Sequence, residues 1–300
     1  MKEEMIYVDP LNDVGFKIMF GPKNGKVNML NFLKAILPDL GIEDLEYLDT
    51  EQTGVTPDER RAVFDLSVLL NDGTRVTVEM QRENLPYFNY RSVYYSTHVI
   101  QSQASRERER QRRECEERGK VRMWDYHYQP VYMIGILEKG MGRESNNGSY
   151  LERYRILETS SHRDLNVDLN YIYLRLDRFE KSESECSGIV DMFAYSLKNM
   201  RELRRMPGTF REASEMVEFY QSGHYASLPY EITHEIETHR NMTTENDMLV
   251  AAKQDGIEIG RADGLAEGQR ESARNFKTLG VDIEIICKAT GLSKEQVEAL

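Results

Sequence analysis

The sequence has little cysteine, no long apolar run and no opening residues typical of a secretory leader, and each absence argues against a class of protein. Its cysteines, Cys115, Cys186 and Cys287, are scattered and odd in number. That pattern fits a reducing compartment and argues against a disulfide framework or a CxxC-type zinc site. No stretch approaches the roughly 20 apolar residues that span a bilayer. The first residues, MKEEMIYVDP, lack the basic start and apolar run of a signal peptide, so we expect a cytoplasmic protein without a membrane anchor.

Several familiar motifs of enzymes are also missing. The stretch 21–27 (GPKNGKV) has neither the spacing of a P-loop nor its Ser or Thr. The glycines at 140 and 142 have no third partner at Ser145, as a dinucleotide fingerprint requires, and no Gly-x-Ser-x-Gly elbow occurs. His234 and His239 are five residues apart, which does not place both on one helix face as a zinc pair requires. The sequence therefore gives no support to these four chemistries.

What is present is a chain that can bury a core. It has 300 residues, of which 40% are hydrophobic and 30% charged, and a net charge of −12. The acidic balance argues mildly against a protein that coats nucleic acid, but it leaves room for an enzyme with a local basic face. Strands are expected over 45–51, 61–70, 74–81, 129–137 and 169–179, and helices over 11–20, 28–37, 87–117 and parts of 183–239. This order predicts an α/β domain with a mixed sheet flanked by helices over residues 1–240.

A β-hairpin places two carboxylates opposite each other. Asn71-Asp72-Gly73 is a turn sequence between two strand-like segments, and a turn centred on Asp72 makes paired residue numbers sum to 144. Asp65 then faces Glu79 at roughly 5 Å between Cβ atoms, where like charges are destabilising. A cation between them would remove that cost, and converging carboxylates suit Mg²⁺ or Mn²⁺. The alternative is a solvent-facing hairpin with unrelated charges.

Other polar residues could complete such a site. Gln81 lies two residues beyond Glu79 on the same strand face and could orient a water molecule, but it cannot supply charge. Asp13, at the start of the first helix, is either a third carboxylate or a helix cap. Arg91 could contact a DNA phosphate, hold Gln81 or be a plain surface residue, and Lys17 has the same DNA and surface alternatives. In a metal-dependent phosphodiesterase, the metal would polarise the scissile phosphate.

Two further segments, one rich in charge and one with regularly spaced glycines, each have two possible roles. The stretch 106–113 (RERERQRR) is either a solvated helix face with local ion pairs or a patch that tracks phosphates. Residues 241–300 are expected to form a helical tail with glycines at 256, 260, 264 and 268, which indicate either close helix packing or a linker. Its end, with a helix stop at Gly291 and a capping box from Ser293 to Gln296, resembles a helix-turn-helix or a small docking hairpin. We expect this tail to mediate homo-oligomerisation.

Several of these segments, in this order, resemble one family. They are residues 12–21 (NDVGFKIMFG), Phe64-Asp65, Glu79-Met80-Gln81, residues 90–95 (YRSVYY) and the tail end at 290–293 (TGLS). Together they resemble the Rpn family of recombination-promoting nucleases, which are transposase-like members of the PD-(D/E)XK superfamily. The resemblance is best over residues 7–140.

The resemblance implies a restriction-endonuclease-like α/β fold and DNA cleavage that depends on a divalent metal. It makes Asp65 and Glu79 the metal-binding acids, Asp13 the acid of the first helix, and Gln81 an E-x-Q variant of the usual E-x-K. The expected function is therefore a Mg²⁺- or Mn²⁺-dependent DNA endonuclease that acts in recombination, mobile elements or defence. The missing Lys leaves an alternative, a catalytically silent DNA-binding or oligomerisation protein that retains the nuclease fold.

Overall fold

The computed structural model describes residues 6–49, 51–52, 62–118, 126–141, 148–165, 168–234, 236, 238 and 267–300. The chain divides into two compact units, Met1–Thr233 and His234–Leu300. Among the described helices, none combines the length and the apolar character that crossing a membrane requires.

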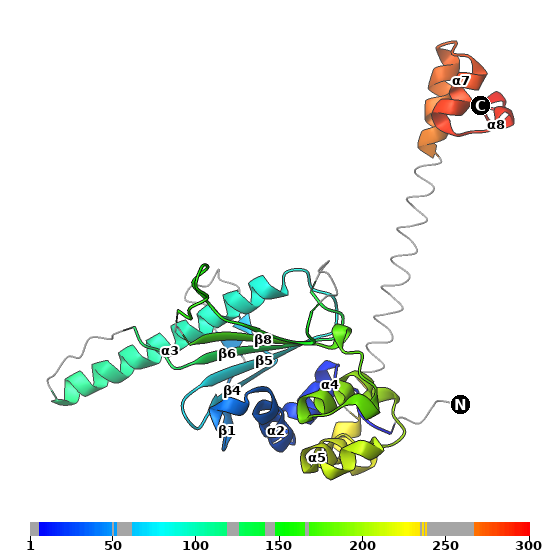
Figure 1. Ribbon diagram of the computed structural model, residues 1–300. Coiled ribbons are helices and arrows are strands. Elements are labelled where there is room, and N and C mark those ends of the chain that lie inside the picture. Colours follow the sequence, from blue (N-terminus) through cyan, green and yellow to red (C-terminus); the bar gives the residue numbers. More distant parts are fainter. Residues whose placement is uncertain are drawn as a thin grey trace. The chain divides into compact units, whose positions relative to one another are not determined.

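The first unit is built on a mixed sheet flanked by helices, as the sequence predicts (Figure 1). The six strands of the sheet that the described residues form lie in the order β1-β4-β5-β6-β8-β7, and β2 pairs with β3 separately. The main elements in chain order are α1 (Asp13–Phe20), α2 (Lys26–Ile36), β1 (Leu45–Tyr47), β2 (Glu51–Gln52), β3 (Ala62–Val63), β4 (Leu66–Leu70), β5 (Arg75–Gln81), α3 (Phe88–Arg118), β6 (Val131–Leu137), β7 (Leu151–Tyr154), β8 (Leu169–Arg175), α4 (Ile189–Asn199) and α5 (Ser214–Ser222).

The predicted hairpin register is confirmed. Val68 pairs with Val76 and Leu66 with Val78 across an antiparallel ladder, so the paired numbers sum to 144. Gly73 closes the turn with φ +88°, a conformation that glycine adopts without steric cost. The prediction of one continuous strand over 61–70 is wrong, however. The backbone bends at Asp65, and Val63 pairs with Glu51 of β2 instead of facing Gln81.

The chain then continues into parallel strands. β5 pairs with β6 and β6 with β8 in parallel, while β7 pairs antiparallel with β8 at the edge. Strand β7 is not predicted from the sequence, because its residues LERY lack a clear apolar pattern. In Figure 1, α3 runs along one face of the sheet, and α2, α4 and α5 lie on the other side. Phenylalanines from four helices pack against one another in that second layer: Phe16, Phe20, Phe32, Phe193 and Phe219.

A missing side chain on β6 lets α3 approach the sheet closely. Gly135 pairs in register with Glu79, and a Cβ at Gly135 would lie 2.6 Å from the ring of Phe88. Phe88, the first residue of α3, is buried and also packs edge-on against Tyr173 of β8, with ring centroids 5.4 Å apart. The start of α3 is therefore anchored beside Glu79, and its next turn is held over that carboxylate.

The spacing in the sequence predicts one stripe along this helix, and all of its members except His98 are exposed: Tyr90, Val93, Tyr94, Thr97 and His98. Tyr90 and Val93 are more than half exposed, and Tyr94 is also exposed. The face that meets the sheet instead carries the buried residues Phe88, Ser92, Ser96 and Val99. Aromatic residues are poor guides to a helix's buried face when small polar residues such as serine line a close helix–sheet contact.

The second unit contains a small helical core of its own. Helical residues 267–278 pack with α7 (Ile283–Thr290) and α8 (Lys294–Glu298) around Ala273, Ile286 and Val297. The predicted helix stop at Gly291, with φ +73°, and the predicted capping box from Ser293 to Gln296 are confirmed. Of the four predicted glycines, only Gly268 lies among the described residues, and a Cβ there would meet open space.

Candidate functional site

Asp65 and Glu79 hold each other through reciprocal contacts between side chain and backbone. The backbone N–H of Asp65 donates to Oε1 of Glu79 at 3.2 Å, and the N–H of Met80 donates to Oδ2 of Asp65 at 2.8 Å. The Asp65 carboxylate thus accepts a ladder hydrogen bond at the bend between β3 and β4. Because the Asp65 side chain accepts this bond, strand pairing can be interrupted at Asp65 while the Met80 N–H keeps a hydrogen-bond acceptor.

Arg91 of α3 supplies the cation nearest to Glu79. Its Nη2 donates to Oε2 of Glu79 at 2.9 Å, and its guanidinium lies over the ring of Tyr95, 5.0 Å from the centroid. Tyr95 packs edge-on against Phe64, the residue before Asp65. The structure favours none of the three roles that the sequence leaves open for Arg91 and indicates a fourth. Arg91 holds Glu79, and its ion pair and the contact of Tyr95 with Phe64 tie α3 to β5 and to the segment before β4.

Both carboxylates lie in an environment that disfavours their charge. The side chain of Glu79 is 4% exposed. Burial raises its pKa to about 8, and the neighbouring Asp65 adds to the rise, while Arg91 opposes it. Burial also raises the pKa of Asp65, against the hydrogen bond from Met80. The pair therefore gains from any additional positive charge that comes between its members.

Helix α1 adds one acid and one base to the surroundings of Asp65. Its cap is Asn12, whose Oδ1 accepts from the N–H of Gly15 at 2.7 Å, so Asp13 is the first helical residue and not the cap. Asp13 and Lys17 are exposed, one turn apart. The charge of Asp13 raises the pKa of Asp65 and that of Lys17 lowers it, although burial is the larger influence. Both predicted α1 residues are thus close enough to act on the charge of Asp65.

Gln81 ends β5, and the residue after it belongs to a separate charged cluster. The backbone carbonyl of Gln81 accepts from the N–H of Glu138 at 3.0 Å. Arg82 lies between Glu138 and Asp9, with its Nε 3.2 Å from Oε2 of Glu138 and its Nη1 3.5 Å from Oδ2 of Asp9. Arg82 is therefore neutralised and does not replace the charge that a Lys at position 81 would bring.

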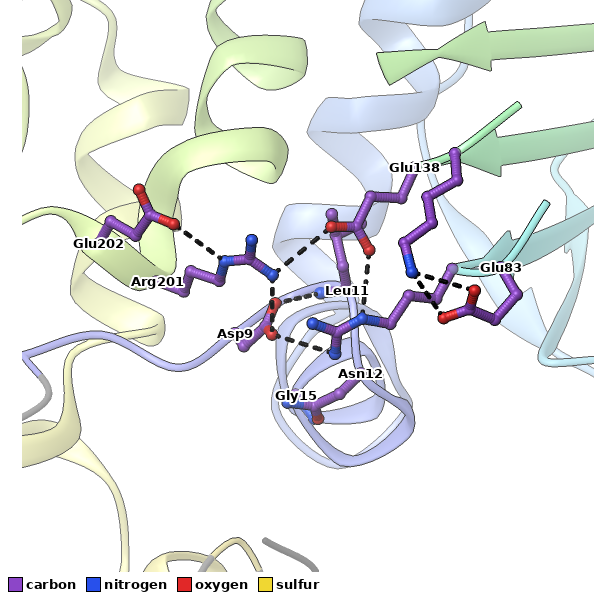
Figure 2. Close-up of polar contacts among 10 residues, drawn as sticks. Asp9, Leu11, Asn12, Gly15, Glu83, Glu138, Arg201 and Glu202 are labelled. Atoms are coloured by element: carbon purple, nitrogen blue, oxygen red, sulfur yellow. Dashed lines mark hydrogen bonds and ion pairs between the residues drawn. The ribbon is translucent and has the colours of Figure 1, made fainter. Parts of the chain in front are cut away.

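The same cluster ties four segments together at this edge of the sheet. Figure 2 shows Arg201 reaching toward Glu138 and Asp9 beside the start of α1. Oδ1 of Asp9 accepts from the N–H of Leu11 at 2.9 Å, which fixes the chain just before the Asn12 cap. The cluster thus joins the ends of β5 and β6 to the entry of α1 and to the 3-10 turn Met200–Glu202. The cluster therefore fixes the entry of α1 at this edge of the sheet.

The donor set fits a divalent cation with few protein ligands. Within the described residues, no group of three or more His, Cys, Asp and Glu side chains is placed to hold a metal. Asp65 and Glu79 therefore offer two carboxylates, with Asp13 nearby as a charge and not assembled into a three-acid group. Mg²⁺ is often bound by one or two carboxylates, with water and substrate phosphate as its other ligands. A paired, buried and charge-disfavoured set of carboxylates meets that requirement.

Sequence reasoning missed the residues that position this pair. The roles of Gly135, Phe88 and Tyr95 depend on packing between segments far apart in the chain. One local clue was available for Gly135, because a glycine inside a strand pattern often marks a close approach by another element.

One comparison with known proteins assigns the chain to a family. The family described as PD-(D/E)XK nuclease family transposase matches residues 10–252, which include every predicted site residue. No curated protein and no solved structure matches the chain. The mixed sheet flanked by helices is consistent with the restriction-endonuclease-like fold that this family implies.

Proposed function

Because the chain belongs to the PD-(D/E)XK nuclease family transposases, we propose that it is a divalent-metal-dependent DNA endonuclease of the kind that acts on mobile or recombining DNA. One observation carries the proposal. Two carboxylates, Asp65 and Glu79, meet at the bend of a hairpin, and burial raises the pKa of both. Perturbed acids of this kind cluster at functional sites.

The chemistry divides between the metal and the chain. Asp65 and Glu79 would hold Mg²⁺ or Mn²⁺, which when bound polarises the scissile phosphate and favours deprotonation of the attacking water. Arg91 keeps Glu79 oriented and adds positive charge to the site. Gln81 could orient a water molecule through its amide. In this proposal, Arg91 supplies part of the positive charge that position 81 lacks.

The DNA would approach from the side where α1 and the start of α3 expose basic and aromatic residues. Lys17 is exposed and close enough to act on Asp65. Tyr87, in the turn just before α3, and Tyr90, in the first turn of that helix, are 61% and 76% exposed. Exposed aromatic rings beside cations are the means by which proteins stack unpaired bases next to a backbone-binding surface. This arrangement supports a substrate with a melted or single-stranded region at the site.

The competing candidate is a silent DNA-binding protein that retains the nuclease fold. Gln81 favours it, because no cationic side chain follows Glu79 at the usual spacing. The carboxylate pair favours the enzyme, since a protein without metal chemistry has no need to keep two acids in that environment.

A cleavage assay on supercoiled and single-stranded DNA separates the two. The enzyme should cut with Mg²⁺ or Mn²⁺, stop in EDTA and lose activity in Asp65→Asn. Lys23→Gln serves as a matched control, because Lys23 is an exposed residue of the loop after α1. Metal-dependent cleavage that Asp65→Asn retains would overturn the site assignment. DNA binding without cleavage under every metal would favour the silent protein.

We further propose that the second unit brings copies of the chain together. Its core is small, and Leu279 and Ile285 are 78% and 59% exposed on its surface. Apolar side chains of that exposure gain from contact with a second copy. Light scattering should give a larger particle mass for the full wild-type chain than for the double variant Leu279→Glu, Ile285→Glu. Equal masses for the two proteins would contradict the proposal.

A further inference from the structure

An open pocket at the other end of β5 is built around arginines. Its volume is about 600 Å³, and its wall combines the start of β5, the middle of α3 and the segment before β6. Arg75 begins β5 and lines the pocket, as does Arg106 of α3. Arg75 and Glu79 are four residues apart on one strand, which puts about 13 Å between them. The pocket is thus separate from the carboxylate pair.

Arg75 is a buried cation without a counter-ion. The residue is 5% exposed, and its Nη1 donates to Oγ of Ser102 at 3.0 Å. Across the described parts of the chain, no carboxylate pairs with Arg75 or with Arg106. Burial, with the charge of Arg106 as a second cause, lowers the pKa of Arg75 to about 10. A buried, uncompensated charge is costly to fold around, so an anion in the pocket would relieve an unfavourable state.

The acids of the pocket do not cancel this charge. Glu107 is held by Arg110 of the same helix, with a closest N–O distance of 2.6 Å. Asp168, the residue before β8, also lines the pocket. Arg110 and Glu107 thus pair with each other, which leaves Arg75 and Arg106 with Asp168 as the other acid of the lining. The ladder of ion pairs over 107–116 also identifies Arg110, Arg112 and Arg113 as solvated helix residues, which distinguishes them from Arg106.

We propose that this pocket binds a phosphate group, with Arg75 and Arg106 as its cationic contacts. The planar guanidinium matches the geometry of phosphate oxygens and favours it over a simple halide. His127 and Tyr128 add ring surface to the wall. The phosphate belongs either to a strand of DNA or to a small phosphorylated molecule. The proposal does not depend on the endonuclease activity, because the pocket uses neither Asp65 nor Glu79.

Binding of inorganic phosphate to the full chain tests the site directly. Calorimetric titration at constant ionic strength, in EDTA, should give a dissociation constant that Arg106→Ala weakens at least 10-fold. Arg112→Ala is the matched control, since it removes the same charge from the same exposed helix, outside the pocket lining. An equal effect of the two variants, or no phosphate binding beyond that of chloride, would overturn the proposal.

A second variant and a competition experiment sharpen the result. Arg75→Gln removes the buried charge and keeps a polar side chain, so it should fold and lose the rise in melting temperature that phosphate causes in the wild type. A rise that persists in this variant would contradict the role of Arg75. Displacement of bound phosphate by uncleaved DNA would identify the DNA backbone as the source. Simultaneous binding would identify a small phosphorylated molecule, and either result supports a phosphate site.

Discussion

Two buried acids of this protein, Asp191 and Glu79, are held in opposite ways. Asp191 lies in the first turn of α4, and its carboxylate accepts from Lys181 at 2.8 Å through both oxygens and from the N–H of Ser187 at 3.0 Å. Tyr150 donates a further hydrogen bond. Burial raises the pKa of Asp191, but these donors outweigh it and lower the pKa overall. Glu79 has Arg91 and one backbone N–H, and it faces a second carboxylate that pushes its pKa upward.

The difference separates a structural acid from a functional one. The donors around Asp191 leave its charge satisfied within the protein, so it gains nothing from a ligand. The surroundings of Glu79 leave its charge disfavoured until a cation arrives. Sites that bind and react are often less stable than the protein could make them, because the same side chains must be available to the ligand. Variants of each acid should therefore have opposite consequences.

The largest expected effect is the loss of cleavage in Glu79→Gln. The amide keeps the shape and can accept from the N–H of Asp65, but it removes a metal ligand. Loss of metal stabilisation worth several kcal/mol corresponds to a fall in rate of about 1,000-fold or more. In EDTA the same variant should melt no lower than the wild type, because a disfavoured charge has gone. Rates of plasmid nicking and thermal unfolding check the two halves. A clearly lower melting temperature would mean that Glu79 is structural after all.

The matching change at the other acid should act on stability alone. Asp191→Asn leaves Lys181 without its partner and replaces one acceptor oxygen by a donor beside Ser187. The carboxylate is buried but the Lys181 side chain is 39% exposed, so the loss of these contacts costs about 1–3 kcal/mol. Urea unfolding should measure that loss, and the nicking rate of the folded fraction should stay within about twofold of the wild type. A large fall in that rate would tie α4 to the chemistry and break the contrast.

The pH dependence of stability should show the same acid. The folded-state pKa of Asp191 is below its ordinary value, so its contribution is present above the unfolded pKa of about 3.9 and is lost as the pH falls through the folded value. The wild type should therefore lose more stability between about pH 5 and pH 2 than Asp191→Asn does. Unfolding curves at several pH values measure this difference. Equal losses of stability in the two proteins would show that other acidic residues determine the loss of stability at low pH.

The sequence predicted the pair but not what holds it. The turn at Asn71-Asp72-Gly73 is local, so the register that brings Asp65 to Glu79 followed from residues within one hairpin. The bend at Asp65 did not, because it depends on the pairing of β3 with β2. The cap at Asn12 and the capping box at Ser293 are likewise local and could be read directly.

Packing between distant segments explains the remaining differences. The buried face of α3 is set by the fit of Phe88 against Gly135 and by Ser96 bonding to Tyr171, 2.9 Å apart, and neither contact leaves a trace in the periodicity of the helix. Arg91 reaches Glu79 only because of that orientation. The pocket around Arg75 is likewise formed by three segments that are far apart in the chain. The sequence pattern predicts the strand β5 but not its contact with the other two segments.

The smallest expected effect tests the residue that departs most from the superfamily pattern. If Gln81 only orients water, Gln81→Ala should slow cleavage by less than about 10-fold, the equivalent of one hydrogen bond. The Mg²⁺ concentration that gives half the maximal rate should not change. Gln81→Lys should cut at least as fast as Gln81→Ala, because Arg91 already places positive charge beside Glu79 and a second cation adds little. Together the two variants test whether Arg91 supplies the positive charge that the lysine of the usual E-x-K pattern would bring. A rise in the Mg²⁺ requirement of Gln81→Ala would make Gln81 a metal ligand, and a gain of about 100-fold in Gln81→Lys would show that Arg91 does not supply the charge of the usual lysine.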